Sequence, residues 1–294
     1  MRLAAIDIGS NAARLLISEV TPDEQGKARF QKLNLIRVPL RLGFDVFEQQ
    51  IISPEKEEQF IKTIRSYKLL SEVYGVDHMK ACATSAMRDA RNGADIIRKT
   101  EELTGISIEI ISGDMEASLI YENHIAENLS RSSSYLYIDV GGGSTELTFF
   151  SPSGLEFQRS FNIGTIRLLK GQVSDFMWDE MRDFIQRETR GHNEGIAAIG
   201  SGGNINKVFS LSRKKDGKPL DIQLLRDYYR ELGSFPLAER MKVYKLKEDR
   251  ADVIVPALLI YINVMSWAGI GEIYVPRIGL ADGLIQHLYQ TVSG

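Results

Sequence analysis

The sequence predicts an α/β protein that is built from two related halves. Strand and helix signals alternate along most of the 294 residues, which is typical of α/β folds. A short motif near the start also recurs about half a chain later. In both places an apolar strand reaches an aspartate, passes through a glycine turn and continues into a second apolar strand. We therefore expect each half to open with a β-hairpin.

The two copies of this motif are close in residue type. Residues 6–11 read IDIGSN and precede the apolar run at 15–17, whereas residues 138–145 read IDVGGGST and precede apolar residues at 147, 149 and 150. Because the offset is about half the chain, duplicated domains explain the repeat better than a solenoid does.

The first half continues with alternating elements after its hairpin. Phe60, Ile64 and Tyr67 recur near helical spacing, and Thr84 is a residue type that caps helices. The expected elements are a helix over 57–74, a strand over 79–83, a helix from 84 to about 91, a helix over 94–104 ended by Gly105, a strand over 106–111 and a helix from 115 to about 128.

A polar, serine-rich stretch at 128–134 predicts a loop and a domain border. The second half then repeats the pattern of the first. The expected elements are hairpin strands between 135 and 161, a helix over 175–189, a strand over 196–199, a helix from 204, a charged loop over 211–219, further helices, a strand over 272–275 and a final helix over about 280–290.

The composition indicates an ordinary soluble globular protein, with 43% hydrophobic and 26% charged residues. A net charge of -3 argues against nucleic acid as a partner. The only cysteine, Cys82, excludes a disulfide framework within the chain. The start of the chain does not resemble a signal peptide, and the apolar stretch 253–270 contains Pro256 and Asn263, which favours a buried helix over a membrane span. We therefore expect a cytoplasmic protein with no membrane partner.

The sharpest chemical feature is the triple glycine, Gly141, Gly142 and Gly143. Glycine lets the backbone approach a ligand closely, and successive N–H groups can then form an anion site. Asp139 before the turn and Glu146 after it could both reach its mouth, where carboxylate oxygens would hold Mg²⁺ near a phosphate. The alternative is a plain glycine-rich hairpin with exposed acids, and the second copy of the motif favours the functional interpretation.

A further glycine turn lies between an expected strand and an expected helix, at Gly200, Ser201, Gly202 and Gly203. The N-terminus of a helix attracts phosphate through its free N–H groups and its dipole. Such turns often serve packing alone, but together with the two hairpin turns this one predicts a phosphate contact.

Two charged side chains near helix starts are candidates for catalysis. Arg88 lies about one turn into its helix and could clamp phosphate with a bidentate fork. Glu116 lies in the first turn after Ser112 and could act as a general base for water. A solvated helical face for Arg88 and a charge that complements the helix N-terminus for Glu116 remain as alternatives, since spacing does not choose between them.

Several ordered blocks closely resemble the exopolyphosphatase and guanosine pentaphosphate (pppGpp) phosphohydrolase family. They run through most of the chain, and several blocks in order are more specific than any single glycine motif. The blocks are AAIDIGSNAARLLI, ACATSAMRDARN, IEIISGDMEASLIY, YIDVGGGSTELTFF, RSFNIGTIRLL, AIGSGGN and RIGLADGL.

The resemblance implies both a fold and a reaction. The fold is two ribonuclease-H-like domains of the actin, sugar-kinase and Hsp70 superfold, flanking a central cleft. The domains would be 1–125 and 126–294, and the last helix, about 280–294, could pack back on the first. The reaction is release of terminal phosphate from inorganic polyphosphate or pppGpp with Mg²⁺, or alternatively Mn²⁺.

The resemblance also implies roles for residues of this chain. Glu116 matches the proposed catalytic glutamate, and Arg88 matches the arginine that contacts phosphate. Asp139 and Glu146, with the loop from Gly141 to Ser144, match the metal and phosphate site.

These roles combine into a mechanism in which water attacks the terminal phosphate directly. Glu116 would activate the water, and Arg88 and the glycine N–H groups would stabilise the charge on the transferred phosphoryl group. Asp7, Ser10 and Asn11 would line the opposite wall, where Asp7 could touch the metal through a water.

Two departures from the family pattern affect the substrate. Met115 stands beside the glutamate where many members have another acid, and the chain has no counterpart of the C-terminal helical domains of long members. We therefore expect short polyphosphate or a guanosine polyphosphate as the partner. A regulator that binds (p)ppGpp with little catalysis is the main alternative, and a small-molecule kinase is a third. A homodimer is the base-rate expectation for the assembly.

Overall fold

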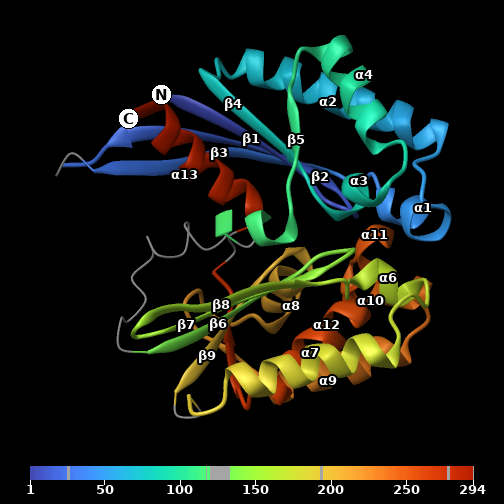
Figure 1. Ribbon diagram of the computed structural model, residues 1–294, viewed down its shortest axis with the longest axis vertical. Helices are drawn as coiled ribbons and strands as arrows, with labels where there is room; N and C mark the ends of the chain where they lie inside the picture. Colours follow the sequence, from blue (N-terminus) through green and yellow to red (C-terminus); the bar gives the residue numbers. More distant parts are fainter. Residues whose placement is uncertain (25–26, 117, 120–132, 193–194, 277–278, 294) are drawn as a thin grey trace. The chain divides into compact units, whose positions relative to one another are not determined.

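The computed structural model describes residues 1–24, 27–116, 118–119, 133–192, 195–276 and 279–293 (Figure 1). It divides into two compact units, of which the first comprises Met1–Ala126 with Leu280–Gly294 and the second comprises Glu127–Gly279. Each unit has a sheet of its own and helices packed on it. The predicted α/β class is confirmed.

The first unit is built on a five-stranded sheet in the order β3-β2-β1-β4-β5. The first three strands form an antiparallel meander, and the last two add in parallel. The elements are β1 (Arg2–Ile8), β2 (Ala13–Pro22), β3 (Ala28–Val38), α1 (Leu42–Gln49), α2 (Pro54–Val73), β4 (His78–Ala83), α3 (Ser85–Asp89), α4 (Gly93–Thr104), β5 (Ile108–Ile110) and α13 (Leu280–Ser293), and residues 113–116 are also helical.

Side chains alternate between the two faces of this sheet. Leu3 and Ala5 of β1 belong to a core that also contains Leu284 and Ile285 of α13. An ion pair of 2.6 Å between Lys32 Nζ and Asp282 Oδ1 joins β3 to the same helix. The last helix of the chain therefore completes the core of the first unit.

The second unit is built on a six-stranded sheet in the order β10-β11-β9-β6-β7-β8. Its core surrounds α12, an apolar helix that packs against α6, α7, α8 and α9. The elements are β6 (Ser134–Val140), β7 (Thr145–Ser151), β8 (Gly154–Phe161), α6 (Thr165–Leu169), α7 (Asp175–Glu188), β9 (Ile196–Ser201), α8 (Gly203–Ser212), β10 (Leu220–Asp221), α9 (Ile222–Ser234), α10 (Leu237–Tyr244), α11 (Glu248–Ala251), α12 (Ile254–Trp267) and β11 (Glu272–Tyr274).

The two sheets repeat one topology. β3-β2-β1-β4-β5 corresponds strand for strand to β8-β7-β6-β9-β11, and β10 is an addition at the edge. The register agrees as well, because Asp7 pairs with Arg14 in the first hairpin and Asp139 pairs with Glu146 in the second. The motif that is repeated in the sequence therefore corresponds to a repeated arrangement of strands in the structure.

Several local predictions differ from the structure. The strand β3 and the short helices α1 and α6 were not predicted. The helix from Thr84 ends at Asp89 rather than near Arg91, and the Thr84 hydroxyl makes no cap but donates to Ile8 O at 3.4 Å. Most of the helix expected over 115–128 and of the loop over 128–134 lies outside the described residues.

Among the described residues, one helical stretch, Glu248–Trp267, is long and apolar enough to cross a membrane by length and composition, and 56% of its apolar window is buried. A core helix passes the same test. Ile254, Leu258 and Val264 of α12 are fully buried in the second unit, in agreement with the buried helix expected from the sequence.

Shortening a buried leucine of α13 tests whether this helix belongs to the first core. Leu284→Ala removes a side chain that is 0% exposed, so we expect a loss of about 2–5 kcal/mol in unfolding free energy. Leu103→Ala on α4 is the matched control, because Leu103 is 50% exposed, and it should cost about 0.5 kcal/mol or less. Urea unfolding measures both, and equal losses would contradict the packing described for α13.

Candidate functional site

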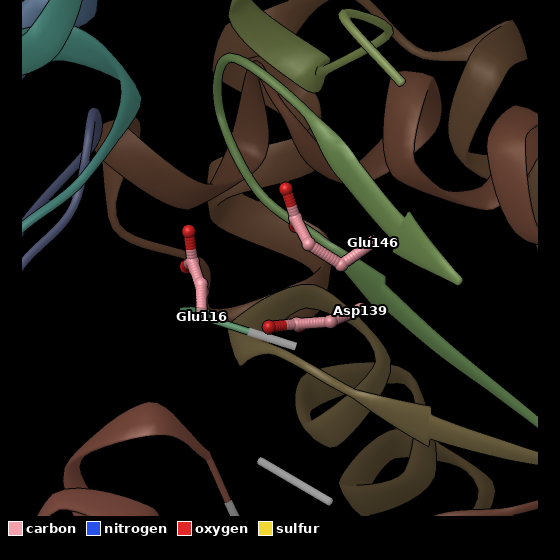
Figure 2. Close-up of side chains that lie close together, drawn as sticks. All are labelled: Glu116, Asp139 and Glu146. Carbon is pink, nitrogen blue, oxygen red and sulfur yellow. The ribbon is translucent and has the colours of Figure 1, made fainter. Parts of the chain in front are cut away.

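The β6–β7 hairpin carries two acidic side chains directly opposite each other. Asp139 and Glu146 are register partners, and Figure 2 shows them leaving neighbouring strands on the same side. A carboxylate oxygen of one lies within 4.8 Å of a carboxylate oxygen of the other. Glu146 is buried and accepts a hydrogen bond from Ser160 Oγ at 2.9 Å. Like charges directly opposite each other destabilise a sheet, so this pair is suited to a bound cation.

The chemistry of this pair fits Mg²⁺. Magnesium prefers oxygen ligands and usually binds through one or two carboxylates while keeping several of its waters. Asp139 and Glu146 supply such a pair at the mouth of a glycine turn.

The first hairpin has a different charge arrangement at the same place. Asp7 is buried, and its Oδ2 accepts a hydrogen bond of 2.6 Å from Arg14 Nη1. Arg14 occupies the register position that corresponds to Glu146 in the second hairpin. An arginine therefore supplies the cation in the first hairpin. The role of Asp7 as a further metal ligand stays a prediction, and its carboxylate is ion-paired in the structure.

The triple-glycine turn is bound from one side through its carbonyl oxygens. The first two N–H groups of α6 donate to the carbonyl oxygens of Gly141 and Gly142, at 3.0 and 2.8 Å. Arg167 Nε donates to that of Gly143 at 2.7 Å. The carbonyl oxygens of all three glycines therefore face α6.

The orientation of the N–H groups follows from these bonds. The peptides of the turn are trans, and in a trans peptide the N–H points away from the carbonyl oxygen. The N–H groups of Gly142, Gly143 and Ser144 therefore point to the side opposite α6. Successive N–H groups on one side of a turn form a concave site for an anion.

Gly164 makes this arrangement possible by its lack of a side chain. A Cβ at Gly164 would lie 2.4 Å from Gly142 O and 2.4 Å from the carbonyl carbon of Gly143. No side chain fits there unless the triple-glycine turn moves. Gly164 was not a candidate from the sequence, although it lies in one of the resemblance blocks.

The turn that follows β9 lies beside the acid pair. β6 and β9 are parallel neighbours, so their carboxyl ends meet at one edge of the sheet. Gly202 has φ 107°, and a Cβ there would lie 3.0 Å from Asp139 Oδ1. Gly203 begins α8. The two glycines therefore bring a helix N-terminus next to the carboxylates.

The other two residues of this predicted turn belong to the strand. Gly200 is buried in β9, where a Cβ would lie 2.7 Å from Ile273 Cδ1, so packing explains this glycine. Ser201 is also buried, and its carbonyl oxygen accepts a hydrogen bond from the hydroxyl of Tyr261.

An arginine lies against the start of α8. A Cβ built on Gly203 would lie 2.5 Å from Arg250 Nη1, and the same nitrogen donates to Asn204 Oδ1 at 3.5 Å. This guanidinium adds a positive charge to a helix N-terminus, where the dipole already favours anions. The sequence does not single out Arg250, because it follows Asn204 by 46 residues and lies on a different helix.

The predicted residues of the first hairpin turn are held within their own unit. Ser10 is buried, and its hydroxyl is 2.8 Å from the hydroxyl of Ser85 on α3. Gly43 N donates to Ser10 O at 2.8 Å, and Arg41 N donates to Asn11 O at 2.9 Å. The turn is therefore fixed by α3 and by the start of α1.

Arg88 and Glu116 also lie in the first unit, and one segment links them. Arg88 Nη1 donates to Ile111 O at 2.9 Å, immediately before the helical residues 113–116. Ser112 caps this turn, because its Oγ accepts from Met115 N at 3.1 Å. Glu116, the third side chain drawn in Figure 2, is partly exposed in the same turn.

Solved structures share the whole fold. A Ppx/GppA family member of Aquifex aeolicus matches with a TM-score of 0.76 and 24% identity, covering 99% of this chain and 98% of that one. An exopolyphosphatase of Cytophaga hutchinsonii matches with a TM-score of 0.83 and 21% identity over the same shares. These structural relatives belong to the actin-like ATPase superfold, so the predicted superfold is confirmed.

A curated relative matches part of the chain at higher identity. It is a bifunctional 3-dehydroquinate synthase/phosphatase of Fusobacterium nucleatum, 34% identical over 172 residues, which are 56% of this chain and 25% of that protein. The chain thus matches about a quarter of the length of this relative.

The sequence pattern of the Ppx/GppA phosphatase family matches residues 20–291, which is nearly the whole chain. The fold, the two Asp–glycine hairpins and the acid pair agree with the resemblance found in the sequence. The chain belongs to the Ppx/GppA phosphatase family.

Proposed function

We propose that this protein is a phosphohydrolase that releases terminal orthophosphate from short inorganic polyphosphate or from pppGpp. The observation that carries the proposal is the convergence, at one edge of the second sheet, of an acid pair, a concave row of N–H groups and a helix N-terminus with an arginine. A chain of phosphates needs such an array of cationic and N–H groups, because each phosphate carries negative charge.

The terminal phosphate would bind at the glycine turn. The N–H groups of Gly142, Gly143 and Ser144 would donate to its oxygens, and Arg250 with the start of α8 would receive the next phosphate along the chain. Groups that are already oriented stabilise charge without reorganising during the reaction.

Asp139 and Glu146 would hold Mg²⁺ or Mn²⁺, which would neutralise phosphate oxygens when bound. Glu116 would orient the attacking water and accept its proton. The proposal requires the two units to bring Glu116 to the acid pair. Arg88, which lies beside the segment that carries Glu116, would stabilise the charge on the transferred phosphoryl group.

A direct comparison of substrates tests the proposal. The purified protein with Mg²⁺ is offered short polyphosphate, long polyphosphate, pppGpp and ATP, and released phosphate is measured. Release from short polyphosphate or pppGpp supports the proposal. Tight binding of (p)ppGpp without release would instead support a regulator, and ATP consumption that depends on an added acceptor would support a kinase.

If Glu116 activates the attacking water, replacing its carboxylate with an amide should strongly reduce phosphate release. Glu116→Gln keeps the size of the side chain but cannot accept a proton, so phosphate release should fall roughly 10²–10⁴-fold with the melting temperature unchanged. Glu101→Gln on α4 is the control, because Glu101 is exposed in the same unit, and it should keep full activity. Near-normal turnover of the Glu116 variant would remove this residue from the mechanism.

The metal role predicts opposite effects with and without the cation. Asp139→Asn relieves the repulsion with Glu146, so in EDTA its melting temperature should equal or exceed that of the wild type. Added Mg²⁺ should stabilise the wild type, as a ligand of the folded state does, but should stabilise this variant less. The exposed Glu180→Gln change should keep the full response to Mg²⁺. An equal response of all three proteins, measured by thermal unfolding, would exclude the acid pair as the metal site.

The close approach of Gly164 predicts a loss that is specific to phosphate binding. Gly164→Ala forces the turn to move, so we expect phosphate release to fall at least about tenfold, as for loss of an oriented donor. Gly271→Ala is the matched control, because a Cβ there meets no atom within 4 Å. If phosphate-release assays give both variants wild-type activity, the turn is not the phosphate site.

A further inference from the structure

Tyr261 of α12 contacts the backbone at Ser201, which lies between the acid pair and the start of α8. Its side chain is fully buried, and its hydroxyl donates to the carbonyl oxygen of Ser201. Burial, together with the nearby charge of Asp139, raises the pKa of this phenol well above its usual range. In the structure the hydroxyl is the donor of this hydrogen bond.

The bonded carbonyl belongs to the peptide that leads from strand β9 into the turn at Gly202, at the start of α8. Ser201 is the register partner of Asp139, and Gly202 follows it. A Cβ at Gly202 would lie 3.0 Å from Asp139 Oδ1 and 3.5 Å from the Tyr261 hydroxyl oxygen. The turn at Gly202 is therefore in contact range of both the carboxylate and the phenol.

The backbone at Gly202 needs such a restraint. Its φ of 107° and ψ of 157° lie in a region that is essentially confined to glycine, and glycine has more freedom to leave a given conformation than any other residue. A fixed carbonyl on the preceding residue limits that freedom, because it sets the plane of the Ser201–Gly202 peptide.

We propose that Tyr261 is a positioning residue, which holds the Ser201–Gly202 peptide against Asp139 and so fixes the spacing between the turn at Gly202 and the carboxylates of Asp139 and Glu146. The inference rests on the proposed function, since it assumes a divalent cation at Asp139 and Glu146. It assigns to the core helix of the second unit a part in organising the site.

The first unit provides a matched comparison. Tyr67 of α2 is also fully buried, and its hydroxyl donates to Ala13 O of the other hairpin at 3.0 Å, with Ile36 O of β3 also in range at 3.3 Å. Removing either hydroxyl leaves a buried carbonyl without this donor, so both changes should lower stability to a similar extent. Of these two tyrosines, Tyr261 is the one whose hydroxyl binds the carbonyl of Ser201, the register partner of Asp139.

The experiment measures the binding of Mn²⁺ to the wild type, Tyr261→Phe and Tyr67→Phe by electron paramagnetic resonance. We expect about tenfold weaker binding for Tyr261→Phe, the equivalent of about 1.4 kcal/mol, and wild-type affinity for Tyr67→Phe. In phosphate-release assays the Tyr261 variant should need more Mg²⁺ for half-maximal activity. Equal Mn²⁺ affinities in both variants would overturn the inference while leaving the proposed function intact.

A second measurement avoids any loss of folding in the variants. 3-Fluorotyrosine placed at position 261 of the otherwise unchanged protein should show a shifted fluorine resonance when Mg²⁺ is added, and the same label at position 67 should not. Shifts of equal size at both positions, or at neither, would contradict the inference. A wild type that binds no Mn²⁺ would instead overturn the proposed function and the inference together.

Discussion

The repulsion between two carboxylates on neighbouring strands is the constraint on which the candidate site depends. Asp139 and Glu146 face the same side of the second hairpin, and Glu146 is buried. A bound cation would offset the repulsion between these two carboxylates. At the same edge of the sheet, the N–H groups of the glycine turn point away from α6 and Arg250 lies at the start of α8, an arrangement that suits an anion.

The β1–β2 hairpin and the β6–β7 hairpin, which carries the candidate metal site, are closely similar. Both hairpins have the same register and the same hydrogen bond across the turn, from Gly9 N to Ala12 O and from Gly141 N to Ser144 O. They differ in the residue opposite the aspartate, which is Arg14 in one and Glu146 in the other. The first hairpin therefore holds an ion pair at the position where the second holds two facing acids.

The sequence could predict the parts of the site that lie close together along the chain. The facing of Asp139 and Glu146 follows from their positions around one hairpin turn, and the duplicated topology follows from the repeat. It could not predict Arg250, which contacts Asn204 across 46 residues, or Tyr261, which contacts Ser201 across 60. Contacts of that kind depend on how helices pack, and helix periodicity specifies only that one face is buried. Strand β3 was missed for a related reason, because its exposed and buried residues do not alternate cleanly.

The position of α13 in the core of the first unit also affects the order of folding. The second unit is continuous in sequence, whereas the first needs Leu280–Gly294, which is synthesised after all of the second. Domains of larger proteins generally fold as units, and the N-terminal one usually folds first during synthesis. Here the unit that begins the chain cannot complete its core until the ribosome has made the last helix. Until then, the apolar residues of β1 and β2 that share a core with α13, among them Leu3, Ala5 and Leu16, lack this partner.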